Sequence, residues 1–392
     1  MLTREDIGEL ARFESPEGCA ISFYYQPDTP QDKSHRQEVI LVKDLIRDAL
    51  RRAERSGKNG VLKSDLERIQ TISEHLHGNG RKAKAIFACG SRGIWKEFDV
   101  PPRLMKTELH MNSRFHLRPL SAVANTFPRV GVMLVDRTKA RVLELTLDEM
   151  HEQEKITWEL PRRGKSDGWF GFDAGHAERK VENETMRHFK ELADLIKDKQ
   201  DSRGWDKILI GCRDETWPEV NRHLHSYTKQ KLVAQFPIDP VTATSEQVKT
   251  EVERILAEHQ LSRTTGLIRE VIGESERNAR GVLGLRRTLG ALERGEVQSL
   301  LIGRDFKASV SECRNCGHLD TRMVKQCAAC GGETSEVTDV SDVLLSAAMR
   351  NGIEVVHVDP DLDTEFHIKG GVGALLRFRA DQNTNEALQK AG

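Results

Sequence analysis

The chain has 392 residues, of which 60 are Lys or Arg and 61 are Asp or Glu, giving a net charge of -1 at pH 7. This balance argues against a protein that coats DNA and against a strongly acidic tail. The sequence has no run of about 18 apolar residues, so we expect no membrane-spanning helix. The charged start, with Arg4, Glu5, Asp6 and Glu9, is unlike a secretory signal peptide, so we expect a cytoplasmic protein.

The first predicted domain, residues 1–127, combines helices with short strands. Residues 21–25 are rich in β-formers and are followed by Pro27, which predicts a strand. Apolar residues recur at helical spacing over 39–50, and a second helix is predicted over about 63–76. Two apolar runs, 85–88 and 93–98, predict a hairpin around Gly90.

The second predicted domain, residues 128–260, alternates strands and helices. Residues 130–136 and 140–145 predict two strands that are joined by a turn at 137–139. A helix is predicted from 177 to about 197, and a buried strand over 205–211. This alternation is typical of an α/β layered structure.

The third predicted domain, residues 261–392, follows a linking helix over about 245–259. A helix ending near Arg294 precedes strands at 297–302, 352–358 and 374–378, with another helix over 343–350. We expect an α/β/α sandwich, and an α/β (α+β) multi-domain fold for the whole chain.

A cysteine cluster interrupts this third domain within residues 311–333. The spacing is Cys-x2-Cys, ten residues, then Cys-x2-Cys, and the ligands are Cys313, Cys316, Cys327 and Cys330. Four thiolates satisfy one tetrahedral Zn²⁺ ion in a closed, structural site. An iron–sulfur centre and an oxidised pair are the alternatives. The remaining cysteines, Cys19, Cys89 and Cys212, are expected to be small buried hydrophobes.

Other motifs allow both a functional and a structural interpretation. Residues 370–373 resemble a phosphate-binding loop, but they precede a strand, and a tight turn is favoured. His176 and Glu178 could exchange protons, although acidic residues at a helix start explain them as well. His110 and His116 could stack on bases or cover the hairpin.

Basic residues interleave with aromatic residues over 81–118. This pattern suits RNA, because stacking on bases adds to phosphate contacts, whereas core packing of the aromatics is the structural alternative. The candidate RNA-binding residues of this stretch are Arg81, Lys82, Lys84, Arg92, Lys96 and Arg114.

The order of several short motifs resembles one protein family. Lys84–Gly90 reads KAIFACG, Arg114–Leu120 reads RFHLRPL, and Val130–Arg137 reads VGVMLVDR. The cysteine cluster follows, and then a Gly-Gly turn and the strand Leu376–Phe378. This order resembles the eukaryotic and archaeal class I peptide-chain release factors and their relative Pelota.

The sequence departs from that family in its functional motifs. The family's Gly-Gly-Gln tripeptide, which promotes ester hydrolysis, has no counterpart, because the loop over 162–175 reads RRGKSDGWFGFDAG. The codon-reading Asn-Ile-Lys-Ser motif is missing too, and residues 110–115 replace the Tyr-x-Cys-x3-Phe element. The chain therefore resembles a bacterial branch without the tripeptide, which includes a ribosome hibernation factor.

This resemblance implies a non-catalytic factor that occupies the ribosomal A site as a release-factor or tRNA mimic, in hibernation or under stress. It implies contacts with 16S and 23S ribosomal RNA and a GTPase partner of the elongation factor Tu type. From the middle-domain loop, the candidate RNA contacts are Arg162, Arg163, Lys165, Trp169 and Phe170.

Two alternative functions remain open at the level of the sequence. The first is a peptidyl-tRNA hydrolase or ribosome-rescue release factor, in which Asp167 or Asp173 would position the water molecule. The second is a general RNA-binding protein that is unrelated to ribosomes.

Overall fold

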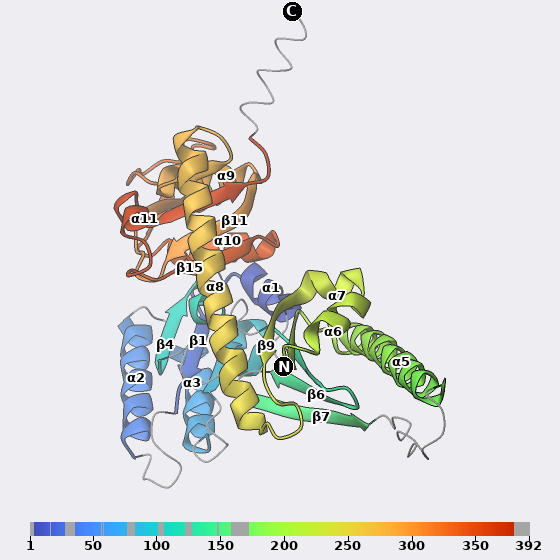
Figure 1. Ribbon diagram of the computed structural model, residues 1–392. Coiled ribbons are helices and arrows are strands. Elements are labelled where there is room, and N and C mark those ends of the chain that lie inside the picture. The colour runs from blue at the N-terminus through green and yellow to red at the C-terminus, as the bar shows by residue number, and fades with distance from the viewer. Residues whose placement is uncertain are drawn as a thin grey trace, which may run out of the picture. The chain divides into compact units, whose positions relative to one another are not determined.

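The computed structural model describes residues 4–15, 17–27, 36–55, 57, 59–76, 83–100, 106–121, 128–146, 149–157 and 172–379. The chain divides into two compact units, and Figure 1 labels their helices and strands. Unit 1 consists of Met1–Thr126 and Arg263–Gly392, and unit 2 consists of Phe127–Ser262. Helices and several sheets are present in a mixed α/β multi-domain fold, as predicted. The division into three domains stays a prediction.

The N-terminal part of unit 1 contains an antiparallel sheet with the strand order β3-β2-β1-β4. The central strand β1 is buried along its whole length because strands flank it on both sides. The predicted hairpin around Gly90 is confirmed, since β2 and β3 pair across a short 3-10 turn. The strands are β1 (Ala20–Tyr25), β2 (Ala83–Cys89), β3 (Ile94–Val100) and β4 (Glu108–Asn112).

Helices α1, α2 and α3 belong to the same part of unit 1, and α2 and α3 contact each other. Apolar residues of α2 at helical spacing, Val42, Ile46, Ala49 and Ala53, are buried on one face. The helices are α1 (Arg4–Arg12), α2 (Arg36–Arg55) and α3 (Asn59–Glu74).

The C-terminal part of unit 1 contains a second sheet with the order β10-β16-β11-β15. Successive residues of β11 point to opposite faces of the sheet. Leu300 therefore belongs to one core with α9 and α10, and Leu301 belongs to another with helix α8 (Ser245–Glu276). Helices thus cover both faces, as in the predicted sandwich. The elements are β10 (Gly281–Leu283), β11 (Val297–Gly303), β15 (Glu354–Val358), β16 (Val372–Leu376), α9 (Leu285–Glu293), α10 (Ser341–Arg350) and α11 (Thr364–Ile368).

A small ribbon is inserted between β11 and α10. Its three strands pair in the order β13-β12-β14, and all are antiparallel. The strands are β12 (Val310–Cys313), β13 (Leu319–Asp320) and β14 (Thr334–Val337).

Unit 2 contains a five-stranded sheet with the order β7-β6-β5-β8-β9. Helix α5 packs on one face through Phe189, Leu192 and Ile196, and the first half of α8 packs on the other through Val248 and Val252. The elements are β5 (Val130–Val135), β6 (Lys139–Thr146), β7 (Glu149–Thr157), β8 (Lys207–Cys212), β9 (Leu232–Pro237), α5 (Phe172–Arg203), α6 (Trp217–His223), α7 (Ser226–Lys231) and α8 (Ser245–Glu276).

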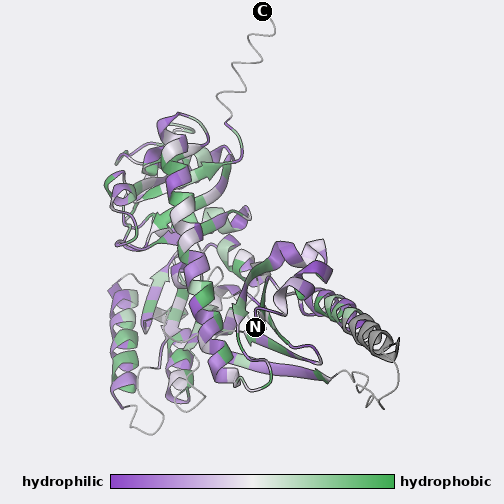
Figure 2. Cartoon of the chain, viewed as in Figure 1, coloured by the Kyte–Doolittle hydropathy of each residue, from purple (hydrophilic) through white to green (hydrophobic). Residues whose placement is uncertain are grey.

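Several elements are longer than predicted or were not predicted. Helix α8 is continuous to Glu276, whereas the sequence pattern predicted an end near His259. Strand β7 is rich in charged residues and lies at a sheet edge, so pairing with β6 decides its conformation. Figure 2 shows this strand mainly in hydrophilic colours, and the C-terminal sheet mainly in hydrophobic ones. Among the described residues, no helix has the length and apolar content needed to cross a bilayer.

Candidate functional site

The four clustered cysteines converge at one end of the ribbon. The Sγ atoms of Cys313 and Cys330 are 3.4 Å apart, and those of Cys316 and Cys327 are 3.6 Å apart. All four sulfur atoms lie within 4.8 Å of one another. Sulfur ligands at about 2.3 Å from a tetrahedral Zn²⁺ ion would be about 3.8 Å apart. The cluster is therefore compatible with a zinc site, which these four residues would hold.

Two matching turns present the sulfur atoms. In each turn a backbone N–H group donates to the first cysteine's Sγ, and a glycine with a φ of 71° donates to its carbonyl oxygen. Only glycine adopts this φ at little cost, so the residue after each Cys-x2-Cys pair is fixed by the turn. The two turns consist of Cys313, Asn315 and Gly317, and of Cys327, Ala329 and Gly331.

Hydrogen bonds favour the thiolate form of Cys330. The backbone N–H group of Gly332 contributes most, and together with the neighbouring thiols and Asn315 it lowers the pKa of Cys330 to about 6. Thiolates, rather than thiols, bind metal ions. A bound Zn²⁺ ion would supply folding energy to a ribbon too small to bury its own core.

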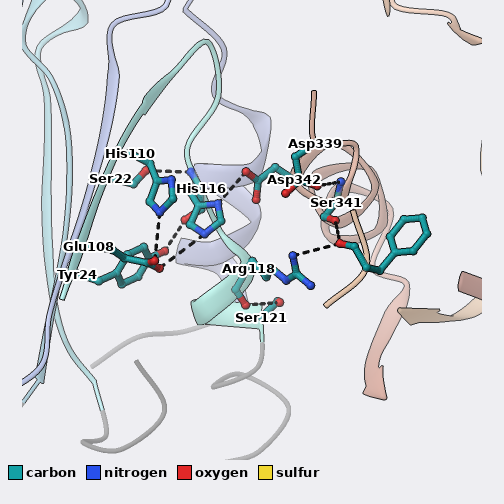
Figure 3. A network of polar contacts seen from close by, with 11 residues as sticks. Ser22, Tyr24, Glu108, His110, His116, Arg118, Ser121, Asp339, Ser341 and Asp342 are labelled. Atoms are coloured by element: carbon teal, nitrogen blue, oxygen red, sulfur yellow. Dashed lines mark hydrogen bonds and ion pairs between the residues drawn. The ribbon is translucent and has the colours of Figure 1, made fainter. Parts of the chain in front are cut away.

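A second polar cluster in unit 1 was not recognised as a site in the sequence (Figure 3). The rings of His110 and His116 are stacked, with centroids 3.9 Å apart and an angle of 22° between their planes. The Nε2 atom of His110 lies 3.4 Å from Oε2 of Glu108, and the Nε2 atom of His116 lies 3.8 Å from Oε1. On its other side, His116 Nδ1 is 2.7 Å from Oδ2 of Asp342 in α10.

The surroundings of this cluster hold it in place. The hydroxyl group of Tyr24 donates to the carbonyl oxygen of His116, whose backbone N–H group donates to Ser22 Oγ at 2.9 Å. Burial raises the pKa of Tyr24 well above its ordinary value, and the charges of Asp342 and Glu108 raise it further. The Tyr24 hydroxyl group therefore keeps its proton and remains a hydrogen-bond donor at neutral pH.

The sequence contained only part of the signal for this cluster. Residues i and i+2 of a strand share a face, so a strand over residues 108–112 would have paired Glu108 with His110. His116 is brought to Glu108 and His110 by a loop, and Asp342 is brought there by helix α10. Because 226 residues separate His116 from Asp342, no local sequence pattern could predict their contact.

Further polar contacts join the same two parts of unit 1. Arg118 donates to the carbonyl oxygens of Gly303 and Phe306, at 3.1 and 3.3 Å. The Ser121 hydroxyl group donates to the carbonyl oxygen of Arg118, and its Oγ is 2.7 Å from Nε2 of His357. Burial, with the nearby charges of Arg304 and Arg118, lowers the pKa of His357 to about 4.

The predicted RNA-binding residues of the first domain have mixed surroundings. Lys84 pairs with Glu97 and Asp99 at 3.3 and 3.4 Å, and Lys96 pairs with Glu9. Arg114 is 14% exposed and is bound by carboxylates, whereas Arg92 is exposed in the turn between β2 and β3. The positions that lie outside the described residues are Arg81, Lys82, Arg162, Arg163, Lys165, Trp169 and Phe170. Their role in RNA contact stays a prediction.

The remaining sequence motifs are structural where they are described. Gly370 and Gly371 have φ values of 116° and 63° and form a tight turn. The sequence pattern favoured this turn over a phosphate-binding loop. Cys19, Cys89 and Cys212 are buried, as predicted. The side chains of residues 176 and 178 lie outside the described part of the chain.

Comparisons with known proteins place this geometry in context. Residues 116–275 match the family model described as Bacterial archaeo-eukaryotic release factor family 10. Peptide chain release factor subunit 1 of Methanocaldococcus jannaschii is 23% identical over 84% of this chain and 85% of the relative. The Methanosarcina mazei protein of the same description is 23% identical over 91% and 92% of the two chains.

Solved structures are similar along nearly the whole chain. A model of ribosome-bound archaeal Pelota and ABCE1 covers 96% of this chain and 94% of the other, with 14% identity and a TM-score of 0.42. The family match and the similarity along most of the archaeal release factors agree with the motif order of the sequence. The chain is thus similar, through this family match and these relatives, to the eukaryotic- and archaeal-type class I peptide-chain release factors.

Proposed function

We propose that this protein is a non-catalytic ribosome-binding factor that occupies the A site as a release-factor or tRNA mimic during hibernation or stress. One observation carries the proposal: the chain matches archaeal release factors along most of their length, yet it has no Gly-Gly-Gln tripeptide. The body of such a factor is retained, whereas the group that promotes ester hydrolysis is missing. The hibernation factor Balon is the type of protein that this combination resembles.

The chemistry of the replacement loop supports a non-catalytic role. Residues 162–175 contain no glutamine, and residues 172–175, predicted as the end of the loop, belong to helix α5. A water molecule could therefore be positioned only by other polar groups such as Asp167 or Asp173. A carboxylate beside an anionic transition state is electrostatically unfavourable. Peptidyl-tRNA hydrolysis is therefore the weaker candidate function.

Contacts with ribosomal RNA follow from the proposed division into three domains. Residues 1–127 would lie near the decoding centre, and the loop of domain 128–260 would extend toward the peptidyl-transferase centre. A near-neutral net charge is compatible with this, because a local basic face suffices for phosphate contact. On the first domain, exposed Arg92 is the best described candidate. From the loop, Trp169 and Phe170 would stack on bases and Arg162, Arg163 and Lys165 would meet phosphates.

A translational GTPase of the elongation factor Tu type is the proposed partner. The third domain, residues 261–392, would contact it, with the zinc ribbon as part of that domain. Co-purification of the tagged chain with such a GTPase, in the presence of a non-hydrolysable GTP analogue, tests this part separately.

Ribosome binding is tested by co-sedimentation with ribosomes from stationary-phase cells, followed by cryo-EM of the bound fraction. We expect density in a vacant A site. Arg92→Ala should weaken ribosome binding and lower the salt dependence of the affinity. Arg222→Ala removes an equal charge from an exposed position of α6 in unit 2, and it should leave both quantities unchanged. Absence from the ribosome fraction under all growth conditions would instead favour a general RNA-binding protein.

Catalysis is tested by peptidyl-tRNA release from purified ribosomes. We expect no release above background from the wild-type chain. Turnover that is lost in Asp167→Ala or Asp173→Ala would identify a hydrolase and would contradict the non-catalytic proposal.

A further inference from the structure

We propose that Glu108, His110 and His116 bind a divalent transition-metal ion of the Zn²⁺ type, at a site separate from the cysteine cluster. Two imidazole nitrogens and one carboxylate oxygen would be its protein ligands. Asp342 of α10 would orient His116 and so tie the end of the N-terminal sheet to the C-terminal part of unit 1 (Figure 3).

The contacts of His116 leave its Nε2 atom available to a cation in this cluster. An ionised Asp342 can only accept a hydrogen bond, so the proton at their 2.7 Å contact belongs to Nδ1 of His116. In a neutral imidazole, Nε2 then carries a lone pair, and this atom faces the Glu108 carboxylate at 3.8 Å. The lone pair of Nε2 and the negatively charged carboxylate repel each other. A cation bound between them would be attracted to both groups.

Two buried atoms of the cluster have no hydrogen-bond partner among the described residues. They are Nε2 of His110, on the side facing Glu108, and Oδ1 of Asp342. Unpaired buried polar atoms cost free energy, and an ion or ordered water is the usual explanation for them. An ion bound between Glu108 and the two imidazole rings would account for Nε2 of His110.

The donor set matches a specific class of metal. The ligand atoms of Glu108, His110 and His116 all lie within 4.8 Å of one another. Imidazole with carboxylate is typical of zinc and related divalent ions, and three protein ligands leave one position for water. A histidine ligand usually donates its second ring N–H group to a carboxylate, as His116 does to Asp342.

One adjustment accompanies binding. The two rings are nearly parallel, with 22° between their planes, so their Nε2 atoms point side by side rather than at a common point. A rotation of one ring about its soft χ2 torsion directs both atoms at the ion.

Metal analysis of the full-length protein, equilibrated with Zn²⁺ and desalted, tests the proposal. We expect two zinc ions per wild-type chain and one after His110→Gln. His225→Gln is the matched control: His225 also contacts a carboxylate, Asp194, at 2.8 Å, but it belongs to no group of three possible metal ligands among the described residues. The control should retain both ions.

Co²⁺ substitution distinguishes the two sites. Loading the cysteine cluster should give sulfur-to-cobalt charge-transfer bands, whereas loading the histidine cluster should give only weaker d–d bands that are lost in His110→Gln. Asp342→Asn should weaken the second ion's binding about 10–100-fold, since it removes an outer carboxylate. Asp339→Asn, three residues earlier, is the control, because Asp339 caps the backbone of Ser341.

Two results would overturn the proposal. One is a wild-type chain that binds a single metal ion and, with Co²⁺, shows only the sulfur-to-cobalt bands, which would mean that protons alone compensate Glu108. The other is an equal loss of metal in His110→Gln and His225→Gln, which would indicate adventitious surface binding. Wild-type stoichiometry needs no variant, so poor folding of a mutant does not obscure the outcome.

Discussion

The guanidinium group of Arg114 forms two hydrogen bonds with the carboxylate of Glu312, at 2.9 and 2.5 Å, although 198 residues separate them. Arg114 follows the last strand of the N-terminal sheet, and Glu312 lies in β12 of the ribbon. Their side chains are 14% and 15% exposed, so the pair is largely shielded from water. Paired, planar contacts of this kind are both strong and geometrically specific.

Removal of Glu312 should destabilise unit 1. We expect Glu312→Ala to lower the free energy of unfolding by about 2 kcal/mol, because a mostly buried guanidinium group loses its main partner. Chemical denaturation measures this change. Glu14→Ala is the control: Glu14 also binds Arg114 but is 51% exposed, and it should cost less than about 1 kcal/mol. Equal effects of the two substitutions would show that the ion pair contributes no specific stability.

Gly131 should tolerate no side chain. A Cβ atom at this position would overlap the indole ring of Trp205, which is completely buried. We therefore expect Gly131→Ala to destabilise unit 2 by about 3 kcal/mol or more. Gly266 is exposed in α8 and has open space around it. Gly266→Ala should therefore raise the free energy of unfolding by about 0.5–1 kcal/mol. Thermal melting compares the two variants, and a stable Gly131→Ala protein would contradict the packing described here.

Metal removal should loosen the ribbon selectively. If zinc supplies its folding energy, a strong chelator should speed amide hydrogen exchange in β12 and β14 while the buried strand β11 stays protected. Cys327→Ser should have the same effect without a chelator. Cys89→Ala, which changes a buried cysteine outside the cluster, should leave exchange in the ribbon unchanged. Ribbon protection that survives chelation would contradict a structural metal.

His357 should make stability depend on pH below about 6.5. Its pKa is about 4 in the fold, against about 6.5 in an unfolded chain. Between these values the unfolded state binds a proton that the folded state excludes, so stability is lost as the pH falls. Between these two pKa values, we expect His357→Gln to reduce the slope of the unfolding free energy against pH by up to about 1.4 kcal/mol per pH unit. Urea denaturation at several pH values measures this slope. Parallel curves for both proteins would contradict this, and above pH 7 the two should differ by a constant.

The sequence alone determined those features that depend on residues close together in the chain. Two strand-forming runs, 130–136 and 140–145, predicted a hairpin, helical spacing over 39–50 predicted α2, and two Cys-x2-Cys turns predicted a converging cluster. In each case the interacting groups lie within a few residues or on one face of one element. The order of the motifs likewise indicated the similarity to archaeal release factors that the comparisons report, because motif order is retained when sequence identity is low.

Only the tertiary structure decided which distant groups meet. Charge-rich residues 149–157 form a strand because β6 offers an edge, a context that local propensity does not contain. Arg114, predicted from its charge as an RNA contact, is held by Glu312, and His116 is oriented by Asp342. These partners are about 200 residues apart, and bringing them together is the work of the packed core rather than of any local pattern.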